Sequence, residues 1–164
     1  MNTRKDTFLR AIVLLCLPAV GLNSEEKYSG PLPPKPDVLY LMHATNLVET
    51  EAGQARQENR KNENTYIISG ASSPARTPMA EPIFIIDAGQ VVPDRLELYK
   101  LDVKYGNREV SISSKPRKGG GKLYLTVTTL QNHLYKIEAN EPLENGQYGI
   151  SPSDGNRVFC FEVY

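Results

Sequence analysis

The sequence predicts an all-β protein, an antiparallel β-sandwich of about ten short strands. Apolar and polar side chains alternate with a period of two over most of the chain after residue 37. The alternating segments are short, and clusters of Gly, Pro, Asn, Asp and Ser separate them, as is usual at turns. No segment shows the apolar periodicity of an amphipathic helix. Many short strands with frequent turns are typical of a sandwich or a barrel.

The N-terminal residues predict an export signal. The positively charged start contains Arg4, Lys5 and Arg10. An apolar core follows at residues 11–17, and small side chains at residues 19–21 suit cleavage by signal peptidase. We therefore expect a signal peptide over residues 1–21, a mature chain beginning at Leu22, and an exported location, either periplasmic or secreted.

A membrane anchor is the alternative for the same segment. A spanning helix needs about 20 consecutive apolar residues, whereas residues 11–22 supply only about a dozen and are interrupted by Pro18. Lipidation at Cys16 would require a small residue before the cysteine, and Leu15 stands there. We expect no stable membrane insertion once the signal has been removed.

A Pro-rich tether and one domain are expected after the signal. The flexible tether, residues 22–36, contains Pro31, Pro33, Pro34 and Pro36. Proline lacks the amide donor and favours the extended polyproline conformation, so this stretch predicts a spacer, with recognition of its prolines by a partner as the alternative. Residues 37–164 have the usual length of one domain, which we expect to be a single β-sandwich.

Charge and cysteine content narrow the class of protein. The chain has 19 basic and 19 acidic side chains, and loss of three bases and Asp6 with the signal leaves 16 and 18. This balance gives no electrostatic attraction to nucleic acid, so we expect no nucleic-acid partner. Without Cys16, Cys160 is the only thiol, and no intrachain disulfide can form. Its position between two phenylalanines favours a small buried side chain over a reactive thiol.

In the first half of the domain, alternation predicts strands at residues 38–42, 47–50, 65–69 and 83–87. The first two form an opening hairpin. Residues 51–64 break the pattern with charged and amide side chains, and Ala52 and Ala55 are their only apolar side chains. Because such a segment buries almost nothing, we expect a solvated loop or a frayed helical turn there.

The longest predicted strand covers residues 95–105. Its apolar side chains change face between Leu98 and Leu101, so we predict a β-bulge near Tyr99 or Lys100. Gly106 and Asn107 then supply the positive φ angles of a two-residue turn, which pairs this strand with residues 109–113. Further strands are expected at residues 122–130 and 134–139, and a last hairpin is expected at residues 147–150 and 157–163.

Near the C-terminus, Leu143, Gly146 and Tyr148 form the pattern L-x-x-G-x-Y. This pattern resembles the tyrosine corner of immunoglobulin-like sandwiches. The resemblance implies that the Tyr148 hydroxyl bonds to upstream backbone, that residues 157–163 are the last strand, and that the fold is a Greek-key sandwich of two antiparallel sheets.

The same pattern followed by F-x-F-x-V, at Phe159, Phe161 and Val163, resembles the ending of a loose group of exported bacterial β-sandwich proteins without an assigned activity. The resemblance implies a fold and an exported location. It carries over no catalytic residue.

Motifs for catalysis and metal binding are missing from the sequence. The stretch around residues 118–122 is Gly-rich, but Pro116 and Leu123 occupy the glycine and hydroxyl positions that a phosphate loop requires. Neither His43 nor His133 has a second ligand at metal-binding spacing, and there is no G-x-S-x-G motif for a nucleophilic serine. We therefore expect no catalytic residue, no metal and no cofactor.

A Gly-rich hairpin tip with a basic patch is the expected structure of this stretch. Together with an outward-facing tyrosine on the next strand, the patch makes a candidate binding surface of Lys115, Arg117, Lys118, Lys122 and Tyr124. Tyrosine on an exposed strand can bind sugars or proteins, because its ring is apolar and its hydroxyl stays hydrated.

The function expected from these observations is that of a non-catalytic exported interaction module, which binds a protein or a glycan of the cell envelope. Two alternatives remain open. One is a structural or assembly subunit that pairs with another chain through an edge strand. The other is a hydrolase with an unrecognised site, which a cleft with convergent polar groups of perturbed pKa would favour.

Overall fold

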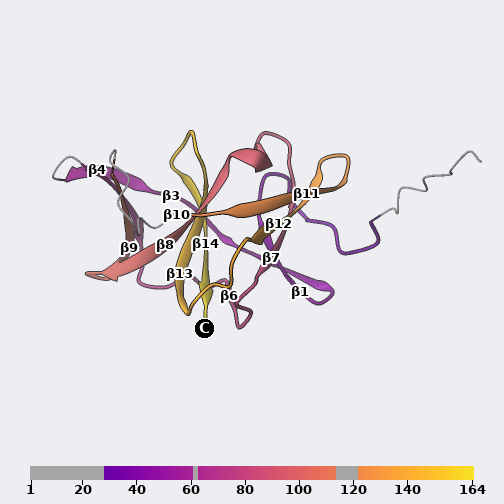
Figure 1. Cartoon of the computed structure of the whole chain (residues 1–164), viewed down its shortest axis with the longest axis horizontal. Helices are drawn as coiled ribbons and strands as arrows, with labels where there is room; N and C mark the ends of the chain where they lie inside the picture. The colour runs from indigo at the N-terminus through magenta and orange to yellow at the C-terminus, as the bar shows by residue number, and fades with distance from the viewer. Residues whose placement is uncertain (1–27, 61–62, 114–121) are drawn as a thin grey trace, which may run out of the picture.

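The computed structural model describes residues 28–60, 63–113 and 122–164. Over these residues the chain forms 14 β-strands in two sheets, and one short 3-10 turn at Pro93–Arg95 is the only helical segment (Figure 1). The predicted all-β antiparallel class is confirmed, with more strands than the sequence indicated.

The predicted signal peptide and Leu22 lie outside the described residues. Residues 28–39, which include the described part of the expected tether, contain no helix or strand. Within the described ranges, no helix has the length and apolar character needed to cross a membrane.

The small sheet has five strands. Their order is β11 (Leu125–Gln131), β12 (Leu134–Ala139), β7 (Ile83–Asp87), β1 (Tyr40–His43) and β2 (Asn46–Glu49). The predicted opening hairpin is confirmed, since β1 and β2 pair from Tyr40↔Glu49 to His43↔Asn46. All pairs in this sheet are antiparallel.

The large sheet has nine strands. Its main path is β3 (Glu51–Gln54), β14 (Arg157–Val163), β13 (Gly146–Pro152), β8 (Leu96–Lys104), β9 (Asn107–Ser113), β5 (Glu63–Ser69) and β4 (Arg56–Arg60). Two short strands join it: β10 (Lys122–Leu123) pairs with β8, and β6 (Arg76–Thr77) runs parallel to β14. The predicted last hairpin is confirmed by the antiparallel pairing of β13 with β14.

The large sheet curls back on itself. Strands β3 and β4 stand at opposite ends of its strand order, yet Ala55 alone separates them in the chain. The sheet must therefore bend until its two ends approach each other at Ala55. We call the curled part from β3 to β4 the half-barrel (Figure 1).

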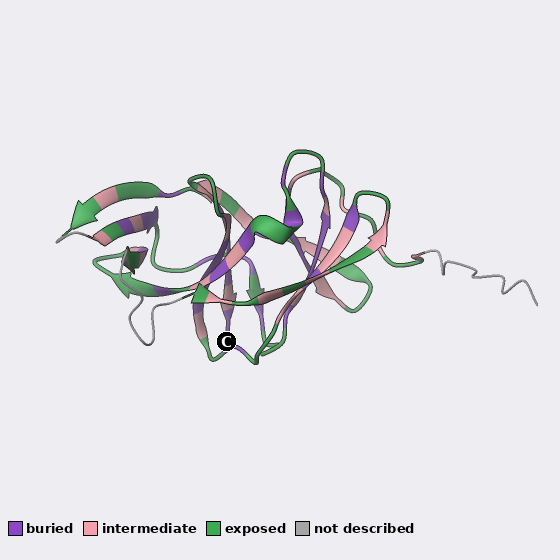
Figure 2. Cartoon of the chain, turned by 45° about the horizontal axis from the view of Figure 1, so that its top comes forward, coloured by how far each residue is buried: buried purple, intermediate pink, exposed green. Residues whose placement is uncertain are grey.

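The main core lies between the two sheets. It joins Leu41, Phe84 and Ile137 of the small sheet to Ile150 and Phe161 of the large one, and all five are fully buried. Figure 2 shows buried stretches, in purple, along strands in the middle of the molecule. The rings of Phe84 and Phe161 meet edge to face, with centroids 4.9 Å apart. This contact ties the centres of the two sheets together.

A second, smaller core lies inside the half-barrel, on the other face of the large sheet. Its buried members are Ala55, Ile68, Leu101, Val158 and Cys160. In β8, Leu98 packs in the main core and Leu101 packs in the second core. The apolar side chains change face along this strand because both of its faces are buried. The predicted β-bulge is wrong, because β8 pairs with β13 from Leu96 to Leu101 without a register shift.

The loop or helical turn predicted for residues 51–64 is also wrong. The described residues of this range form β3, β4 and the start of β5. Strand β3 pairs with β14, which is distant in sequence, and β4 pairs with the neighbouring β5. The polar side chains are accommodated because Glu51 pairs with Arg108, while Glu58 pairs with Arg56 and Arg60. Backbone pairing, rather than burial of apolar side chains, holds this segment in strands.

Two further boundaries differ from prediction. In the β8–β9 hairpin, Lys104 pairs with Asn107, so the turn residues are Tyr105 and Gly106, with φ of 52° and 76°. The expected strand over residues 122–130 is interrupted at Tyr124, where the chain passes from the large sheet to the small one.

Candidate functional site

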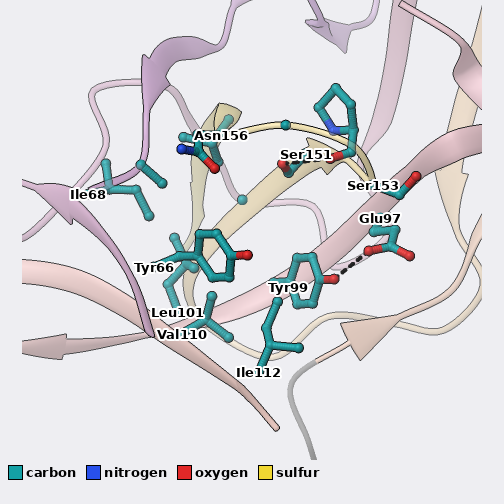
Figure 3. Close-up of a pocket in the computed structure, with 15 residues that line it drawn as sticks. Tyr66, Ile68, Glu97, Tyr99, Leu101, Val110, Ile112, Ser151, Ser153 and Asn156 are labelled. Carbon is teal, nitrogen blue, oxygen red and sulfur yellow. Dashed lines mark hydrogen bonds between the residues drawn. The ribbon is translucent and has the colours of Figure 1, made fainter. Parts of the chain in front are cut away.

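A cavity of about 230 Å³ lies inside the half-barrel. Its base is apolar and is formed by Ala55, Ile68, Leu101, Val110 and Val158. Its rim carries polar groups, from Tyr66, Glu97, Tyr99, Ser151, Ser153 and Asn156. Figure 3 shows the two tyrosine rings at the cavity, with the Tyr99 hydroxyl directed at Glu97.

The cavity exists because the large sheet splits. Strands β8 and β9 pair only from Lys104↔Asn107 to Asp102↔Glu109. The next residues in this register, Leu101 and Val110, do not pair, and both line the cavity. Beyond this point β9 follows β5, while β10 pairs with β8 at Leu98 and Tyr99. We call the gap between β9 and the β8–β10 pair the split.

Gly149 of β13 leaves room for the apolar side chains at the base of the cavity. It stands opposite Tyr99 of β8 and Cys160 of β14 and lines the cavity. A Cβ atom at this position would lie 2.9 Å from Val158 Cγ2 and 3.5 Å from Leu101 Cδ1. Glycine therefore allows the two apolar side chains to close over the strand.

A buried arginine closes the end of the half-barrel opposite the rim. Arg108, Val110 and Ile112 alternate on the inner face of β9, which puts Arg108 at one end and Ile112 at the cavity mouth. The Arg108 guanidinium donates to both carboxylate oxygens of Glu51, and to the carbonyl oxygens of Ser69 at 2.8 Å and Gly70 at 2.9 Å. Burial alone would lower the pKa of Arg108, but the Glu51 hydrogen bonds raise it, so the side chain stays charged.

Cys160 is fully buried, as the sequence predicts. Burial raises the pKa of its thiol to about 12, even though the nearby Arg108 charge acts in the opposite direction. The thiol is therefore protonated at neutral pH. It serves as a small apolar side chain of the second core.

Among the described residues, Glu97 is the one charged side chain that lines the cavity. It accepts hydrogen bonds from the Tyr99 hydroxyl at 2.5 Å and from the Lys122 ammonium at 2.6 Å. Burial acts to raise the pKa of Glu97, but these two bonds outweigh it and lower the pKa. Burial and the same carboxylate raise the pKa of Tyr99. At neutral pH the rim thus holds a charged carboxylate that already accepts hydrogen bonds from Tyr99 and Lys122.

The predicted binding surface falls in three places. Lys115, Arg117 and Lys118 lie outside the described residues. Lys122 reaches the cavity rim through Glu97. Tyr124 is 71% exposed, as expected for an outward-facing tyrosine, but it does not line the cavity.

The predicted hydroxyl contact of Tyr148 is present. Its hydroxyl donates to the backbone carbonyl oxygen of Glu144 at 2.8 Å, and its ring stacks on Phe161 with centroids 5.4 Å apart. Leu143 is buried and donates its backbone N–H to the carbonyl oxygen of Ala80, and Gly146 begins β13. This corner belongs to the main core and lies apart from the cavity lining.

Sequence reasoning missed the cavity. The sequence predicts a solvated loop or helical turn at Ala55 and a strand at Tyr66 and Ile68, and it places none of the three beside a cavity. The signal that could have revealed the site was the change of apolar face in residues 95–105, because it reports a strand buried on both sides.

Comparisons with known proteins give no assignment: no protein-family model, curated protein or solved structure matches the chain. Among the described residues, no group of three or more His, Cys, Asp or Glu side chains is placed to hold a metal ion.

Proposed function

We propose that the protein is a non-catalytic exported interaction module and that the half-barrel cavity is where it binds a protein or glycan of the cell envelope. One observation carries this proposal: a cavity of about 230 Å³ combines an apolar base with a polar rim and opens at the split in the sheet. Concave apolar sites with a few fixed polar groups are the usual form of ligand sites. A ligand would place an apolar group against Leu101 and Val110 and meet the rim with its polar groups.

We also propose that the fold is an immunoglobulin-like Greek-key sandwich. The order β1-β7-β12-β11 corresponds to strands A, B, E and D, and the order β14-β13-β8-β9 corresponds to G, F, C and C′. The hydroxyl bond of Tyr148 supports the same assignment. On this interpretation, β2 to β5 are an insertion, and its hairpin β4–β5 extends the second sheet into the half-barrel.

The chemistry of the rim favours binding over hydrolysis. A general acid or base needs a pKa near the working pH. The pKa of Glu97 is lowered and that of Tyr99 is raised, so each is held away from neutrality. The thiol of Cys160 is buried and protonated. These groups suit a fixed hydrogen-bonding surface better than proton transfer.

Site-specific photocrosslinking in the producing cells tests the proposed function. A photoreactive amino acid at Ser153, on the cavity rim, should give one discrete product, which mass spectrometry identifies as protein or glycan. The same probe at the exposed Thr128, on β11, is the position control and should not give it.

Two tryptophan substitutions complete the test. Ile112→Trp at the cavity mouth should suppress the Ser153 product about tenfold by filling the entrance. Val103→Trp, on the exposed part of the neighbouring strand, should leave the product unchanged. The proposal is refuted by absence of a product, by equal products at Ser153 and Thr128, or by insensitivity to Ile112→Trp.

A second candidate, an assembly subunit, is favoured by β11. This outermost strand of the small sheet spans seven residues without a charged side chain, and its three exposed side chains are threonines. Edge strands that lack charge are prone to pair with another chain. By contrast, the outer strand β4 carries Arg56, Glu58 and Arg60.

A further inference from the structure

We infer that the ligand is an extended segment of a partner protein, which adds as a strand to the edge of β9 that no described strand occupies and places one large apolar side chain in the cavity. This inference rests on the proposed function and names the class of its ligand. It follows from the pairing of β9, the chemistry of the split and the size of the cavity.

The first step concerns the edge of β9. On one side, β9 pairs with β5 over its whole length, from Asn107 to Ser113. On the other side it pairs with β8 only as far as Glu109. From Val110 onward, no described strand occupies this second side. Alternate residues of such an edge present unpaired N–H and C=O groups, which an added strand can pair.

The second step concerns the opposite wall of the split. Here β10 covers β8 at Leu98 and Tyr99. Because β8 is already paired with β13 on its other side, its backbone at these residues is occupied from both sides. An incoming strand would therefore pair with β9 and pack its side chains, not its backbone, against Tyr99.

The third step concerns what fits. A dry cavity of roughly 150 Å³ lined by apolar side chains can hold benzene. The present cavity, about 230 Å³, thus matches one large aliphatic or aromatic side chain and is too small for an extended oligosaccharide. In strand addition, backbone pairing supplies affinity and pockets for alternate side chains supply specificity. The split places such a pocket directly beside the edge of β9 that no described strand occupies.

The fourth step concerns desolvation. The Glu97 carboxylate is already bonded to Tyr99 and Lys122, so an entering apolar side chain leaves no unpaired charge among the described residues of the lining. A sugar, in contrast, would have to compete for these committed groups. The bonding within the rim therefore favours an apolar guest from a polypeptide.

Selection from a phage-displayed library of twelve-residue peptides, against the protein purified from its producing cells, tests this inference. Selected peptides should share one large apolar residue. In the free peptide, N-methylation of the backbone amide that faces β9 should weaken binding about tenfold, and methylation of the next amide should change it less than about twofold. Ile112→Trp should abolish peptide binding, whereas the matched Val103→Trp should not.

Hydrogen exchange supplies an independent readout. Bound peptide should slow exchange at alternate backbone amides over Val110, Ser111 and Ile112, and should leave those of β11 unchanged. Equal effects of methylation at neighbouring amides, or unaltered exchange in β9, would overturn strand addition even with crosslinking at Ser153 intact. A glycan product at Ser153 with no peptide selected would overturn it as well. Failure of both crosslinking and peptide binding would refute the proposed function itself.

Discussion

Arg108 and Glu51 form a bidentate ion pair inside the half-barrel, with N–O distances of 2.6 and 2.8 Å. Arg108 belongs to β9 and Glu51 to β3, with three other strands between them in the sheet order. The Arg108 side chain is fully buried, whereas Glu51 keeps 29% of its side chain exposed. The ion pair therefore joins two sides of the half-barrel, and of its two partners only Glu51 has access to water.

This difference in burial predicts unequal effects on stability. Glu51→Ala leaves a buried guanidinium without its carboxylate and should lower the free energy of unfolding by about 3 kcal/mol. Arg108→Met leaves a carboxylate that water can reach and fills part of the space, so it should cost about half as much. Urea denaturation measures both.

The matched control for this pair is Glu49, which bonds the exposed Lys35 at 2.9 Å. Glu49→Ala should cost less than about 1 kcal/mol, because exposed ion pairs contribute little. A larger loss for Arg108→Met than for Glu51→Ala would contradict the role assigned to burial.

Asp37 predicts a specific dependence of stability on pH. Its Oδ1 accepts backbone N–H bonds from Gly89, Gln90 and Val91, at 2.8, 2.7 and 2.8 Å. Burial acts to raise the pKa of Asp37, but these bonds outweigh it and hold the pKa below its ordinary value of 3.8. Because the pKa of Asp37 is lower in the folded state, ionised Asp37 stabilises the protein at pH values above 3.8. This stability is lost as the pH falls through the folded pKa.

Asp37→Asn should therefore be less stable than the natural chain by about 1 kcal/mol at neutral pH, and the difference should shrink as the pH falls below 3.8. Asparagine suits the test because it tolerates the positive φ of 58° at this residue. Unfolding free energies measured from acid to neutral pH check the trend. Asp154→Asn, at an exposed turn, is the control, and an Asp37→Asn difference that does not vary with pH would refute the assignment.

The parts of the fold that the sequence predicts are those set by local signals. The β8–β9 hairpin follows from a Gly at its turn, and the last hairpin from the turn-rich residues 151–156. The Tyr148 contact spans only four residues, so a short motif can encode it. In each case the residues that specify the element lie within or next to it.

The half-barrel depends on contacts that local patterns do not encode. Strand β3 pairs with β14, more than 100 residues later in the chain, and its Glu51 is accommodated only because Arg108 reaches it. Composition alone therefore predicts a solvated segment for residues 51–64. The cavity was missed for the same reason, since it arises where β9 leaves β8 to follow a strand that the sequence did not place beside it.

Gly149 predicts a steric coupling in the base of the cavity. Gly149→Ala would put a Cβ atom 2.9 Å from Val158 Cγ2, so we expect a loss of about 1–3 kcal/mol from overpacking. Val158→Ala removes that methyl group. The double variant should therefore lose clearly less stability than the sum of the two single variants, as measured by a double-mutant cycle.

Gly53 of β3 is the control for the glycine substitution, because no atom lies within 4 Å of a Cβ built there. Gly53→Ala should be neutral or slightly stabilising, through the lower entropy of the unfolded chain. Strict additivity of Gly149→Ala and Val158→Ala would show that the predicted contact does not limit the packing.

The edge of β11 predicts how the chain would self-associate. Because this edge has no charged side chain, copies brought to high concentration should pair through it. Thr128 stands opposite Lys136 of β12, which pairs with Glu138, so Thr128→Glu adds a charge to the edge beside an ammonium group that limits its cost within one chain. Sedimentation velocity over a range of concentrations should show association of the natural chain and its loss in Thr128→Glu, while Tyr105→Glu at the fully exposed hairpin tip leaves it unchanged. A natural chain that stays monomeric throughout would remove the assembly candidate, and association that survives Thr128→Glu would place the contact elsewhere.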